Sequence, residues 1–425
     1  MSVQIASASV PQVLVIGGGF GGVAVCKALY DAPVKISLID KTNHQLFQPL
    51  LYQVATSILS STDIATPLRQ IFRHQKNVTV FLGEVTSIDL TSRTFSVDGE
   101  KVPMPYDYLV VAVGAQPSYF GHDEFEAHAP AIKSLSDAEY LRNKILSAFE
   151  FAERQLEPSA HQELLTFVLV GGGATGVELS AAICAMAHRT LTSQFRRCDP
   201  AKLRVILVQS GPRILPQFPE VLSAMALQRL RDLGVEVRLN SRVTGVDVDG
   251  VTIGADRIAT KNVIWTAGVA PHPLVRTLGL TSDRSGRVVV QGDCSVPGRP
   301  EVFIVGDAAS FTASNGEPLP GVAQVALQQG RYVGQLITRK IADNLVAKPF
   351  HYFDKGNLAV IGPFYAVIDS FGIRSTGFWA FWVWIYVHLE FLPTPFNRLR
   401  TAIQWIWMVA TNTRNGSLII PAKKS

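Results

Sequence analysis

One local pattern occurs twice in this chain, and it limits the possible folds more than any other feature. A short apolar segment at residues 13–16 runs directly into a glycine-rich stretch at 17–22, and a helical pattern follows. The same order recurs at residues 167–170 and 171–176. Glycines at such a strand-to-helix turn let the backbone approach a pyrophosphate, which then lies on the N-terminus of the helix. The pattern predicts two dinucleotide-binding folds and therefore an α/β chain.

The strand that follows the first glycine stretch ends on an acid. This strand, at residues 34–39, leads into Asp40, which follows Gly22 by 18 residues. That is close to the ~20-residue spacing at which a carboxylate meets the 2′-hydroxyl of an adenosine ribose. Two such folds on one chain are typical of a flavin together with a nicotinamide, so we expect one cofactor of each kind.

The second copy departs from this fingerprint. Its next strand, at residues 203–208, ends on Gln209, and Arg213 lies four positions further on. A carboxylate would repel a 2′-phosphate, whereas an amide would not, and an arginine could pair with the phosphate. We expect NADPH to be accepted alongside NADH or instead of it. The alternative is that Gln209 binds the ribose while Arg213 faces solvent or a backbone carbonyl.

Further strand-to-turn passages divide the chain. Apolar runs at residues 109–113 and 262–265 each lead into a glycine turn, and the run at 302–305 is followed by Asp307. Ligands collect at the carboxyl ends of strands in open α/β sheets, so we expect cofactor contacts there. A helical pattern at 134–157 connects the two folds.

These passages place one nucleotide fold inside the other. We expect two Rossmann-like dinucleotide-binding domains, with the FAD domain discontinuous and the NAD(P)H domain inserted into it, plus C-terminal amphipathic membrane-associating helices. The expected ranges are 1–118 and 285–345 for the FAD-binding domain, 119–284 for the NAD(P)H-binding domain with its connecting helix, and 346–425 for the C-terminal region.

Charge is distributed unevenly along the chain. Residues 371–425 hold six of the 39 Lys and Arg but one of the 34 Asp and Glu, which leaves 33 of each in residues 1–370. The whole net charge of +5 therefore lies in the C-terminal region, and a balanced body argues against a nucleic-acid partner. The six bases are Arg374, Arg398, Arg400, Arg414, Lys423 and Lys424.

The same C-terminal region contains five of the six tryptophans. Its apolar run at residues 378–387 is shorter than the ~18 residues that suggest a spanning helix. A second apolar stretch at 399–409 follows Arg398 and Arg400. Aromatic rings beside cations suit a helix that lies in the headgroup region of a membrane, with the bases facing anionic lipid. The alternative is a dimer interface or a helix packed on the core.

The cysteines exclude some kinds of chemistry. Cys26, Cys184, Cys198 and Cys294 are scattered, so we expect four reduced thiols, no disulfide relay and no metal site. Residues 1–12 contain no basic residue and no long apolar run, so we expect neither a signal nor a transit peptide.

Several longer stretches resemble one enzyme family. They are LID at 38–40, NH at 43–44, FQPLLYQVA at 47–55, GGGATGVEL at 171–179, AQVALQQG at 323–330, and DKG at 354–356 before IG at 361–362. Together they are similar to type II NADH:quinone oxidoreductases, the non-pumping, single-subunit flavoproteins of respiratory membranes. The resemblance extends from about residue 12 to about residue 420.

The resemblance implies roles for particular side chains. Asp40 would bind the adenosine ribose of FAD, and Asp307 a ribityl hydroxyl, although Asp307 also suits a helix N-cap. Glu178 would lie near the nicotinamide and flavin, where it orients the nicotinamide and assists charge or proton movement. Gln324 and Gln328 share one helix face that would lie beside the isoalloxazine and the quinone. The alternative for these two is a buried pair with satisfied hydrogen bonds.

We therefore expect Glu178, Gln324 and Gln328 to be catalytic. Gln48 and Lys355 are weaker candidates for the quinone pocket, and His44 is a weak candidate for a proton carrier. The expected cofactor contacts are Gly17, Gly19, Phe20, Gly22, Asp40, Lys41, Gln48, Gly114, Gly171, Gly173, Thr175, Gly176, Gln209, Gly268, Gly306, Asp307, Ala323 and Gln324.

The expected function is hydride transfer from NADH or NADPH to FAD, followed by transfer of two electrons to a membrane quinone without proton pumping. The expected partners are the quinone and the bilayer surface, with a homodimer implied by the resemblance, and the expected location is peripheral, on the cytoplasmic face of a membrane. The alternatives are a flavin reductase of the same fold with a soluble acceptor, or a flavin-binding regulator with little turnover.

Overall fold

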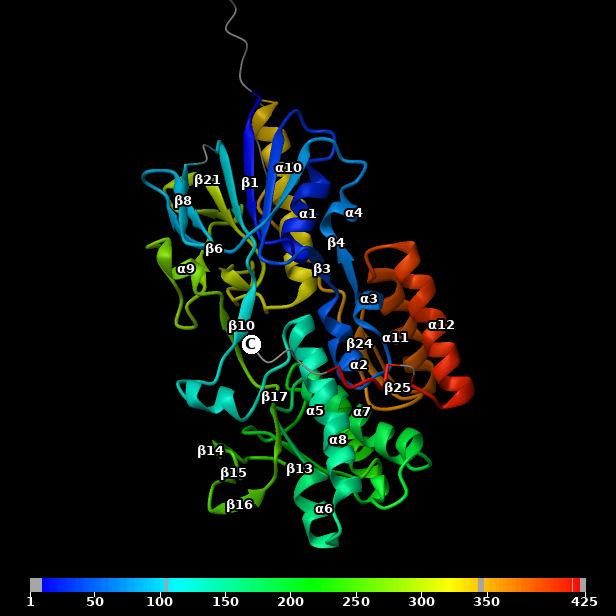
Figure 1. Cartoon of the computed structure of the whole chain (residues 1–425). Coiled ribbons are helices and arrows are strands. Elements are labelled where there is room, and N and C mark those ends of the chain that lie inside the picture. The colour runs from blue at the N-terminus through cyan, green and yellow to red at the C-terminus, as the bar shows by residue number, and fades with distance from the viewer. Residues whose placement is uncertain (1–9, 104–105, 343–347, 415, 421–425) are drawn as a thin grey trace, which may run out of the picture. The chain divides into compact units, whose positions relative to one another are not determined.

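The computed structural model describes residues 10–103, 106–342, 348–414 and 416–420 (Figure 1). The chain divides into two compact units. The first unit contains Met1–Gln45, Thr66–Gln116 and Val269–Asp354, and the second contains Leu46–Ala65, Pro117–Gly268 and Lys355–Ser425.

The first unit is built on a six-stranded sheet with the order β20-β21-β9-β1-β2-β5. All neighbours in it are parallel except β20 and β21. The side chains of β1 are buried from Val13 onward, as expected for a strand in the middle of a parallel sheet. The strands are β1 (Gln12–Ile16), β2 (Lys35–Asp40), β5 (Val78–Leu82), β9 (Tyr108–Val111), β20 (Ser295–Val296) and β21 (Arg299–Ile304).

Two helices of this unit, α1 (Phe20–Ala28) and α10 (Ala323–Ile341), pack closely against each other. The contact depends on glycines in α10. A Cβ on Gly330 would lie 2.3 Å from the carbonyl oxygen of Gly21, and one on Gly334 would lie 2.8 Å from that of Val25. The small residues thus let the two helix backbones touch, which holds the N-terminus of α10 beside the first glycine turn.

Smaller elements complete the first unit. Three antiparallel strands form a separate sheet, β6-β7-β8, and two short parallel strands pair as β19-β22. Their bounds are β6 (Val85–Asp89), β7 (Thr94–Val97), β8 (Glu100–Pro103), β19 (Val288–Val289) and β22 (Ala309–Ser310), and the short helices are α4 (Leu68–Ile71), α9 (Leu274–Thr277) and η5 (Gly306–Ala308). Strands β3 (His44–Leu46), β4 (Ala65–Pro67), β10 (Ala115–Pro117) and β18 (Val269–Pro271) lie where the chain passes from one unit to the other.

The second unit repeats the parallel architecture in a sheet of order β13-β12-β11-β17. Helix α7 (Ala174–Ala185) follows the central strand β11 and packs on the sheet, and it continues into a π-helical segment, η3 (Met186–Leu191). The strands are β11 (Thr166–Val170), β12 (Arg204–Val208), β13 (Val235–Arg238) and β17 (Asn262–Trp265).

Segments far apart in the sequence join this unit. The antiparallel strands β23 (Asn357–Val360), β24 (Ala366–Ser370) and β25 (Ile373–Gly377) lead to helices α11 (Phe378–Phe391) and α12 (Pro395–Thr411), which lie side by side (Figure 1). Helix α12 packs on α3 (Ser61–Ile64), and α2 (Leu51–Ala55) packs between α5 (Leu135–Arg154) and α7. The other elements are η1 (Gln48–Leu50), η2 (Asp123–Ala127), α6 (Pro158–Leu164), η4 (Pro200–Lys202), α8 (Glu220–Asp232), β14 (Val243–Asp247), β15 (Gly250–Ile253) and β16 (Asp256–Ala259).

The α/β fold with two parallel sheets is confirmed. Helix α5 lies within the connecting helix expected at residues 134–157. The sequence predicts that the helix after the second glycine stretch starts beyond Gly176. Helix α7 instead begins at Ala174, so Gly176 is already helical. The functional domain boundaries given above remain predictions. In the described part of the chain, no helix is both long enough and apolar enough to cross a membrane.

The close packing of α1 on α10 can be tested by Gly330→Ala. In an open helix this change is favourable by about 1 kcal/mol, but here the new Cβ would overlap the Gly21 carbonyl oxygen at 2.3 Å. We expect a loss of about 1–3 kcal/mol, seen as a lower melting temperature. Gln335→Ala, at an exposed position of the same helix, is the control. A Gly330→Ala protein at least as stable as wild type would contradict this packing.

Candidate active site

The first glycine turn lies between β1 and α1. Gly17 has φ +102°, and a Cβ there would lie 2.4 Å from the Ala112 carbonyl oxygen. A Cβ on Gly22 would lie 1.8 Å from the Gly17 carbonyl oxygen, so neither position tolerates a side chain. A Cβ on Gly19 would meet no atom of the described residues within 4 Å. The turn is therefore closed on the protein side and open on the other, as a phosphate cradle requires.

Asp40, at the end of β2, fixes this turn. One carboxylate oxygen accepts a hydrogen bond from the Gly18 backbone N–H at 2.6 Å, and the other accepts from the Thr42 N–H and hydroxyl at 2.6 and 2.7 Å. The oxygen that accepts from Gly18 keeps a second lone pair, so the carboxylate can also accept from a ribose hydroxyl. The residues present fit the adenosine end of FAD.

Other expected cofactor contacts gather at the same end of this sheet. A Cβ on Gly21 would meet Val305 at 3.1 Å and Ala326 at 3.5 Å, so the turn, the end of β21 and the start of α10 lie together. A Cβ on Gly21 would also meet the Ala112 side chain at 3.6 Å. Four of the expected contacts lie within three sequence positions of Ala112, Val305 or Ala326: Gly114, Gly306, Asp307 and Ala323. Gly114 and Gly306 have φ +69° and +72°.

Gln329 is a residue of this region that the sequence did not single out. Its side-chain oxygen accepts a hydrogen bond from the Gly306 N–H at 2.7 Å, and its side chain is buried. The bond ties α10 to the turn that carries Asp307. The sequence instead predicted a site role for the adjacent Gln328, because it lies one helical turn after Gln324.

Gln328 exchanges two hydrogen bonds of 2.9 Å with the backbone of Phe353. Its amide therefore holds the segment after α10, which agrees with the alternative of satisfied hydrogen bonds. Gln324 lies one turn earlier on α10, and both belong to the first unit. Glu178 belongs to the second unit, so the three expected catalytic residues are divided between the units.

The second glycine turn has the same construction. Gly171 has φ +115°, and a Cβ there would lie 2.7 Å from the Ala267 N atom. A Cβ on Gly176 would lie 1.9 Å from the Gly171 carbonyl oxygen, whereas one on Gly173 would meet no described atom within 4 Å. Thr175 is exposed in the first turn of α7. This turn also presents an open face for a pyrophosphate.

Gln209 takes the place in the second unit that Asp40 takes in the first. Its side-chain oxygen accepts from the Gly172 N–H at 2.8 Å, which leaves the NH₂ group as a donor. Arg213 donates to the carbonyl oxygens of Phe218 and Pro216, both at 2.9 Å. The guanidinium therefore braces its own loop, as the alternative for Arg213 anticipated.

Gly268 lies just after β17, at the carboxyl edge of the second sheet. It has φ +71°, and a Cβ there would lie 2.3 Å from Cζ of Phe120. The Phe120 ring therefore lies directly on the Gly268 backbone, at the edge where a nicotinamide dinucleotide would be held.

Glu178 lies in α7, four residues after Ala174 at its start. The carboxyl group is buried, and one oxygen accepts a hydrogen bond from the Val360 N–H at 3.2 Å. Burial raises the pKa of Glu178 to about 8, because the charged form loses its hydration. The group is therefore mostly protonated at neutral pH, and it can donate a proton.

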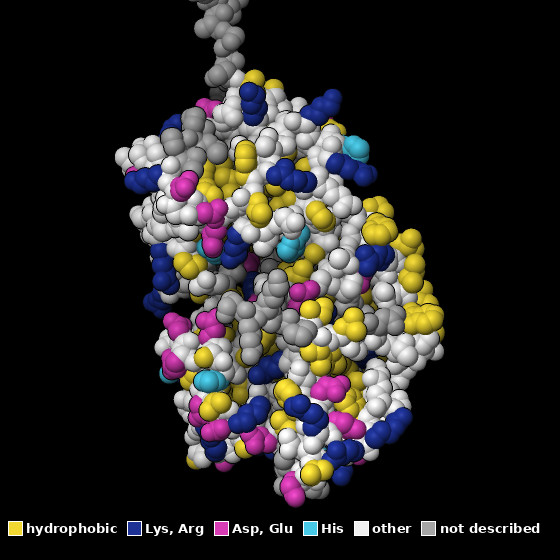
Figure 2. Space-filling model, in the orientation of Figure 1, with side chains coloured by type: hydrophobic (Ala, Val, Ile, Leu, Met, Phe, Trp, Pro, Cys, Tyr) yellow, Lys and Arg dark blue, Asp and Glu magenta, His cyan; other side chains and the backbone are white. Residues whose placement is uncertain are grey.

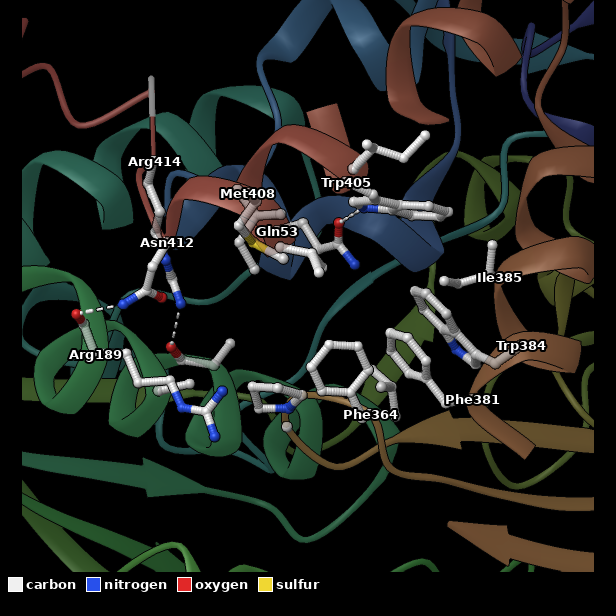
Figure 3. Close-up of a pocket in the computed structure, with 18 of the residues that line it drawn as sticks. Gln53, Arg189, Phe364, Phe381, Trp384, Ile385, Trp405, Met408, Asn412 and Arg414 are labelled. Carbon is white, nitrogen blue, oxygen red and sulfur yellow. Dashed lines mark hydrogen bonds between the residues drawn. The ribbon is translucent and has the colours of Figure 1, made fainter. Parts of the chain in front are cut away.

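Glu178 forms part of the wall of a cavity of about 550 Å³ in the second unit (Figure 3). Segments from α2, α7, η3, α11, α12 and the turn after β23 line it. Figure 3 shows Phe364, Phe381, Trp384 and Ile385 on one side of the cavity and Met408 and Trp405 on the other. The lining is mostly aromatic and aliphatic. The polar residues of the lining are Tyr52, Gln53, Glu178, Arg189, Thr190, Asn412 and Arg414.

Of these polar residues, the sequence analysis singled out Glu178 as a site residue and missed the other six, among them Tyr52, Gln53 and Arg414. Tyr52 and Gln53 lie inside the FQPLLYQVA stretch, which contributes to the family resemblance. Nothing in its pattern indicates that these two residues face a cavity. Arg414 donates to the carbonyl oxygens of Thr56 and Ala182, and burial lowers the pKa of its guanidinium to about 9. Its position depends on tertiary packing alone.

Three bases of the C-terminal region form ion pairs within the second unit, and their expected contact with anionic lipid stays a prediction. Arg398 pairs with Glu390 at 3.0 Å, and Arg400 pairs with the fully buried Asp63 at 3.0 Å. Arg374 lies 3.4 Å from Asp369. The carboxylates of neighbouring elements thus neutralise these charges within the unit. Lys423 and Lys424 lie outside the described residues.

The remaining expected residues lie at exposed or partly exposed positions. Lys41 is 3.9 Å from Glu84 in an exposed ion pair, and Gln48 is exposed in the second unit. Burial lowers the pKa of His44, whose ring lies 3.1 Å from the Asn43 side chain. Lys355 lies over the ring of Phe391 at 5.3 Å. Phe20 begins α1 and is partly buried.

The described residues contain no group of three or more potential metal ligands. The four cysteines are buried and free, and burial raises the pKa of Cys184 and Cys198 to about 12. Buried neutral thiols are poor nucleophiles, so they do not favour thiol chemistry.

Comparison with known proteins identifies relatives over the whole chain. Residues 11–330 match the family model described as pyridine nucleotide-disulphide oxidoreductase. A relative named "Type II NADH:quinone oxidoreductase Ndh", from Mycobacterium tuberculosis, is 44% identical over 422 residues, which cover 96% of this chain and 90% of the relative. A protein named type II NADH:quinone oxidoreductase from Haemophilus influenzae is 28% identical, with 84% and 86% covered.

Solved structures share the fold. The structure of NDH2 from Plasmodium falciparum in complex with NADH superimposes with a TM-score of 0.89 at 19% identity, covering 97% of this chain and 100% of that one. The sulfide:quinone oxidoreductase from Aquifex aeolicus gives a TM-score of 0.72 at 19% identity, covering 97% and 93%. The chain therefore belongs to the pyridine nucleotide-disulphide oxidoreductase family and, within it, to the type II NADH:quinone oxidoreductases.

Proposed function

We propose that this chain is an oxidoreductase that takes a hydride from NADH onto FAD and passes two electrons to a quinone, without pumping protons. Its membership of the type II NADH:quinone oxidoreductases is the observation that carries this function. A soluble acceptor or a purely regulatory role is not favoured, because the relatives are named as quinone oxidoreductases.

The first unit would hold FAD. The turn at residues 17–22 would take the pyrophosphate, Asp40 the adenosine ribose and Asp307 a ribityl hydroxyl. When bound, FAD supplies the chemistry that accepts a hydride and returns two electrons to an acceptor. Gln324 and Ala323, at the N-terminus of α10, would lie against the flavin ring.

The second unit would hold NADH on the turn at residues 171–176. Gln209 would donate from its NH₂ group to the ribose hydroxyls, since its oxygen already accepts from Gly172. Arg213 is held by two carbonyl oxygens, which supports NADH over NADPH as the main donor. Glu178 lies on the helix that follows this turn.

The cavity lined by Glu178, α11 and α12 would receive the quinone. Its volume of about 550 Å³ lies within the ~300–1,000 Å³ range of small-molecule sites. Its aromatic and aliphatic lining suits a quinone ring and the start of an isoprenoid chain. Polar groups at Tyr52, Gln53 and Glu178 would meet the ring oxygens.

Proton balance gives Glu178 a role in this cavity. The hydride supplies two electrons and one of the two hydrogens of the quinol, so each turnover takes one proton from solvent. A buried carboxyl group with a pKa of about 8 is protonated at neutral pH and can donate to a quinone oxygen. Solvent then returns the proton to the carboxylate.

Glu178→Gln tests this role because glutamine keeps the acceptor for the Val360 N–H but carries no acidic proton. We expect kcat with quinone to fall by about 10²-fold. In the wild type, kcat should fall as pH rises through about 8, and this dependence should be lost in the variant. Pre-steady-state reduction of the flavin by NADH, followed by its absorbance, is the control.

A stability measurement checks the same pKa independently. The folded Glu178 carboxyl group keeps its proton up to a pKa of about 8, whereas the unfolded one loses it near the ordinary pKa of 4.5. Stability from this group should therefore be present below about pH 4.5 and be lost as pH rises to about 8. Glu178→Gln should reduce that slope. Equal pH dependence of turnover and of melting temperature in both proteins would refute a proton role for Glu178.

Nucleotide preference can be tested at Gln209. A carboxylate in its place would repel the 2′-phosphate of NADPH but could accept from a ribose 2′-hydroxyl. We expect Gln209→Glu to lower kcat/KM for NADPH relative to NADH by about tenfold, which is about 1.4 kcal/mol. Arg213→Ala, a matched loss of a nearby donor, should leave the ratio unchanged. If Gln209→Glu leaves the ratio of kcat/KM for NADPH to that for NADH unchanged, Gln209 does not contact the ribose.

The C-terminal helices would form a membrane foot, which we define as α11 and α12. Figure 2 shows hydrophobic side chains gathered along the edge of the second unit where α12 lies. Leu399, Ile403 and Trp407 follow one another at helical spacing and are 60%, 54% and 51% exposed. Because three arginines of the region are paired internally, the apolar side chains would supply most of the binding. The enzyme would then be peripheral, and we place it on the cytoplasmic face.

Leu399→Glu with Ile403→Glu tests the foot, since neither residue lines the cavity. Burying a carboxylate in the headgroup boundary is costly, so we expect the variant to leave liposomes in a sedimentation assay. Reduction of a long-chain quinone should fall at least about tenfold more than that of a short-chain, water-soluble quinone. Val221→Glu with Met225→Glu, on exposed α8, is the matched control. Unchanged sedimentation would reject the foot.

We also propose a homodimer, which the exposed apolar surface of the foot could support in addition to lipid binding. The mass of the detergent-solubilised enzyme separates the two uses. A Leu399→Glu, Ile403→Glu protein that stays dimeric but leaves liposomes assigns this face to the membrane, whereas a monomer assigns it to the second copy.

A further inference from the structure

A chain of side-chain hydrogen bonds runs through the wall of the cavity. The Trp405 indole N–H donates to the Gln53 side-chain oxygen at 2.7 Å, and Figure 3 shows the two groups facing each other. The Gln53 NH₂ group then donates to the Tyr52 hydroxyl oxygen at 2.8 Å. All three side chains are buried, and all three line the cavity.

The direction of this chain is fixed by its first member. An indole N–H can only donate, so the atom of Gln53 that faces Trp405 must be the oxygen. The NH₂ group of Gln53 is therefore the atom that faces Tyr52. Because this NH₂ group can only donate, the phenol oxygen has to accept, and its own hydrogen has to point away from Gln53.

Tyr52 is thereby left with a hydrogen to donate. In the described part of the chain, Gln53 is the hydrogen-bond partner of the Tyr52 hydroxyl. Burial, together with the charge of Glu178 when ionised, holds the pKa of Tyr52 well above its usual range, so the phenol keeps its proton. Tyr52 and Glu178 line the same cavity, so a bound carbonyl group could meet both.

We propose that Tyr52 is a hydrogen-bond donor to a quinone oxygen, and that Trp405 is a positioning residue which sets the direction of this donor through Gln53. This inference rests on the proposed quinone-reducing function. Trp405 lies on α12, one of the two helices of the membrane foot. The foot thus has a second role, because its docking on α2 orients a polar group of the cavity.

The neighbouring Trp384 lacks the hydrogen bond that Trp405 makes. Trp384 also lines the cavity and lies close to Trp405, with ring centroids 5.5 Å apart and the two rings tilted by 42°. The Trp384 indole N–H has no hydrogen-bond partner among the described residues. Both rings can contribute packing, but only the Trp405 indole N–H belongs to the hydrogen-bond chain. A phenyl ring at position 405 would keep the packing and lose this donor.

A double-mutant cycle with Tyr52→Phe and Trp405→Phe tests the proposal. Both changes keep an aromatic ring and remove one donor. We expect Tyr52→Phe to lower kcat/KM for a short-chain quinone by about tenfold, and Trp405→Phe by about threefold, from the loss of one neutral hydrogen bond. The double variant should match Tyr52→Phe alone, because Trp405 acts only through that hydroxyl.

Two further readouts separate this role from a loss of packing. Infrared difference spectra should show the carbonyl stretch of bound quinone at higher frequency in both single variants, since the hydrogen bond that weakens the carbonyl is gone. Tyr119→Phe removes a buried hydroxyl that donates to the Ala129 carbonyl oxygen, and it should leave KM for quinone and the spectrum unchanged. Flavin reduction by NADH should be the same in all variants.

The outcomes are distinguishable. If the wild type reduces no quinone, the proposed function fails. If it does, but Tyr52→Phe keeps kcat/KM and the carbonyl frequency of wild type, Tyr52 is not the donor. If Tyr52→Phe behaves as expected but Trp405→Phe adds its full loss in the double variant, Trp405 acts through packing and the positioning role is overturned.

Discussion

Helix α7 is the element on which the two substrate sites that we propose for the second unit depend. It starts at a glycine turn that tolerates no side chain at Gly176, where a Cβ would lie 1.9 Å from the Gly171 carbonyl oxygen. This close contact fixes where α7 starts relative to the carboxyl edge of its sheet. Glu178 follows within its first turns and faces the cavity. One short helix thus carries both the nicotinamide dinucleotide turn and the acid that we assign to the quinone.

The environment of that acid determines its chemistry. Glu178 is buried in the wall of the cavity that α2 and the foot also line, and the Val360 N–H donates to its carboxyl group. The desolvation that this causes outweighs the hydrogen bond and raises the pKa of Glu178 to about 8. The apolar lining that suits a quinone therefore also keeps Glu178 protonated, so that it can donate to the quinone that we propose. In the function that we propose, the foot is therefore part of the active site as well as an anchor.

Much of this arrangement could be predicted from the sequence. The two glycine turns have steric requirements that glycine alone meets, so their spacing predicts both parallel sheets, and Asp40 and Gln209 follow from the strand that comes next. Glu178 could be identified because it belongs to the same continuous motif. Local pattern and local geometry agree at these positions.

The rest depends on contacts between distant segments, which no local pattern encodes. Gln53 and Trp405 are 352 positions apart, and their hydrogen bond exists only because α12 docks beside α2. Arg400 was expected to face anionic lipid because it lies beside an aromatic, apolar stretch, and that pattern gives no sign of its ion pair with Asp63 from another part of the chain. Gln329 was overlooked beside Gln328 because spacing cannot tell which of two adjacent amides reaches the Gly306 N–H.

We propose that quinone is reduced in the cavity between α2, α7 and the membrane foot. Photolabelling with an azido-quinone, followed by peptide mapping of the holoenzyme in liposomes, tests it most directly. We expect the label on residues 52–58, 360–364 or 402–410, with protection by excess unlabelled quinone and none by NAD⁺. Labelling confined to the first unit, with the same protection by quinone, would contradict the claim.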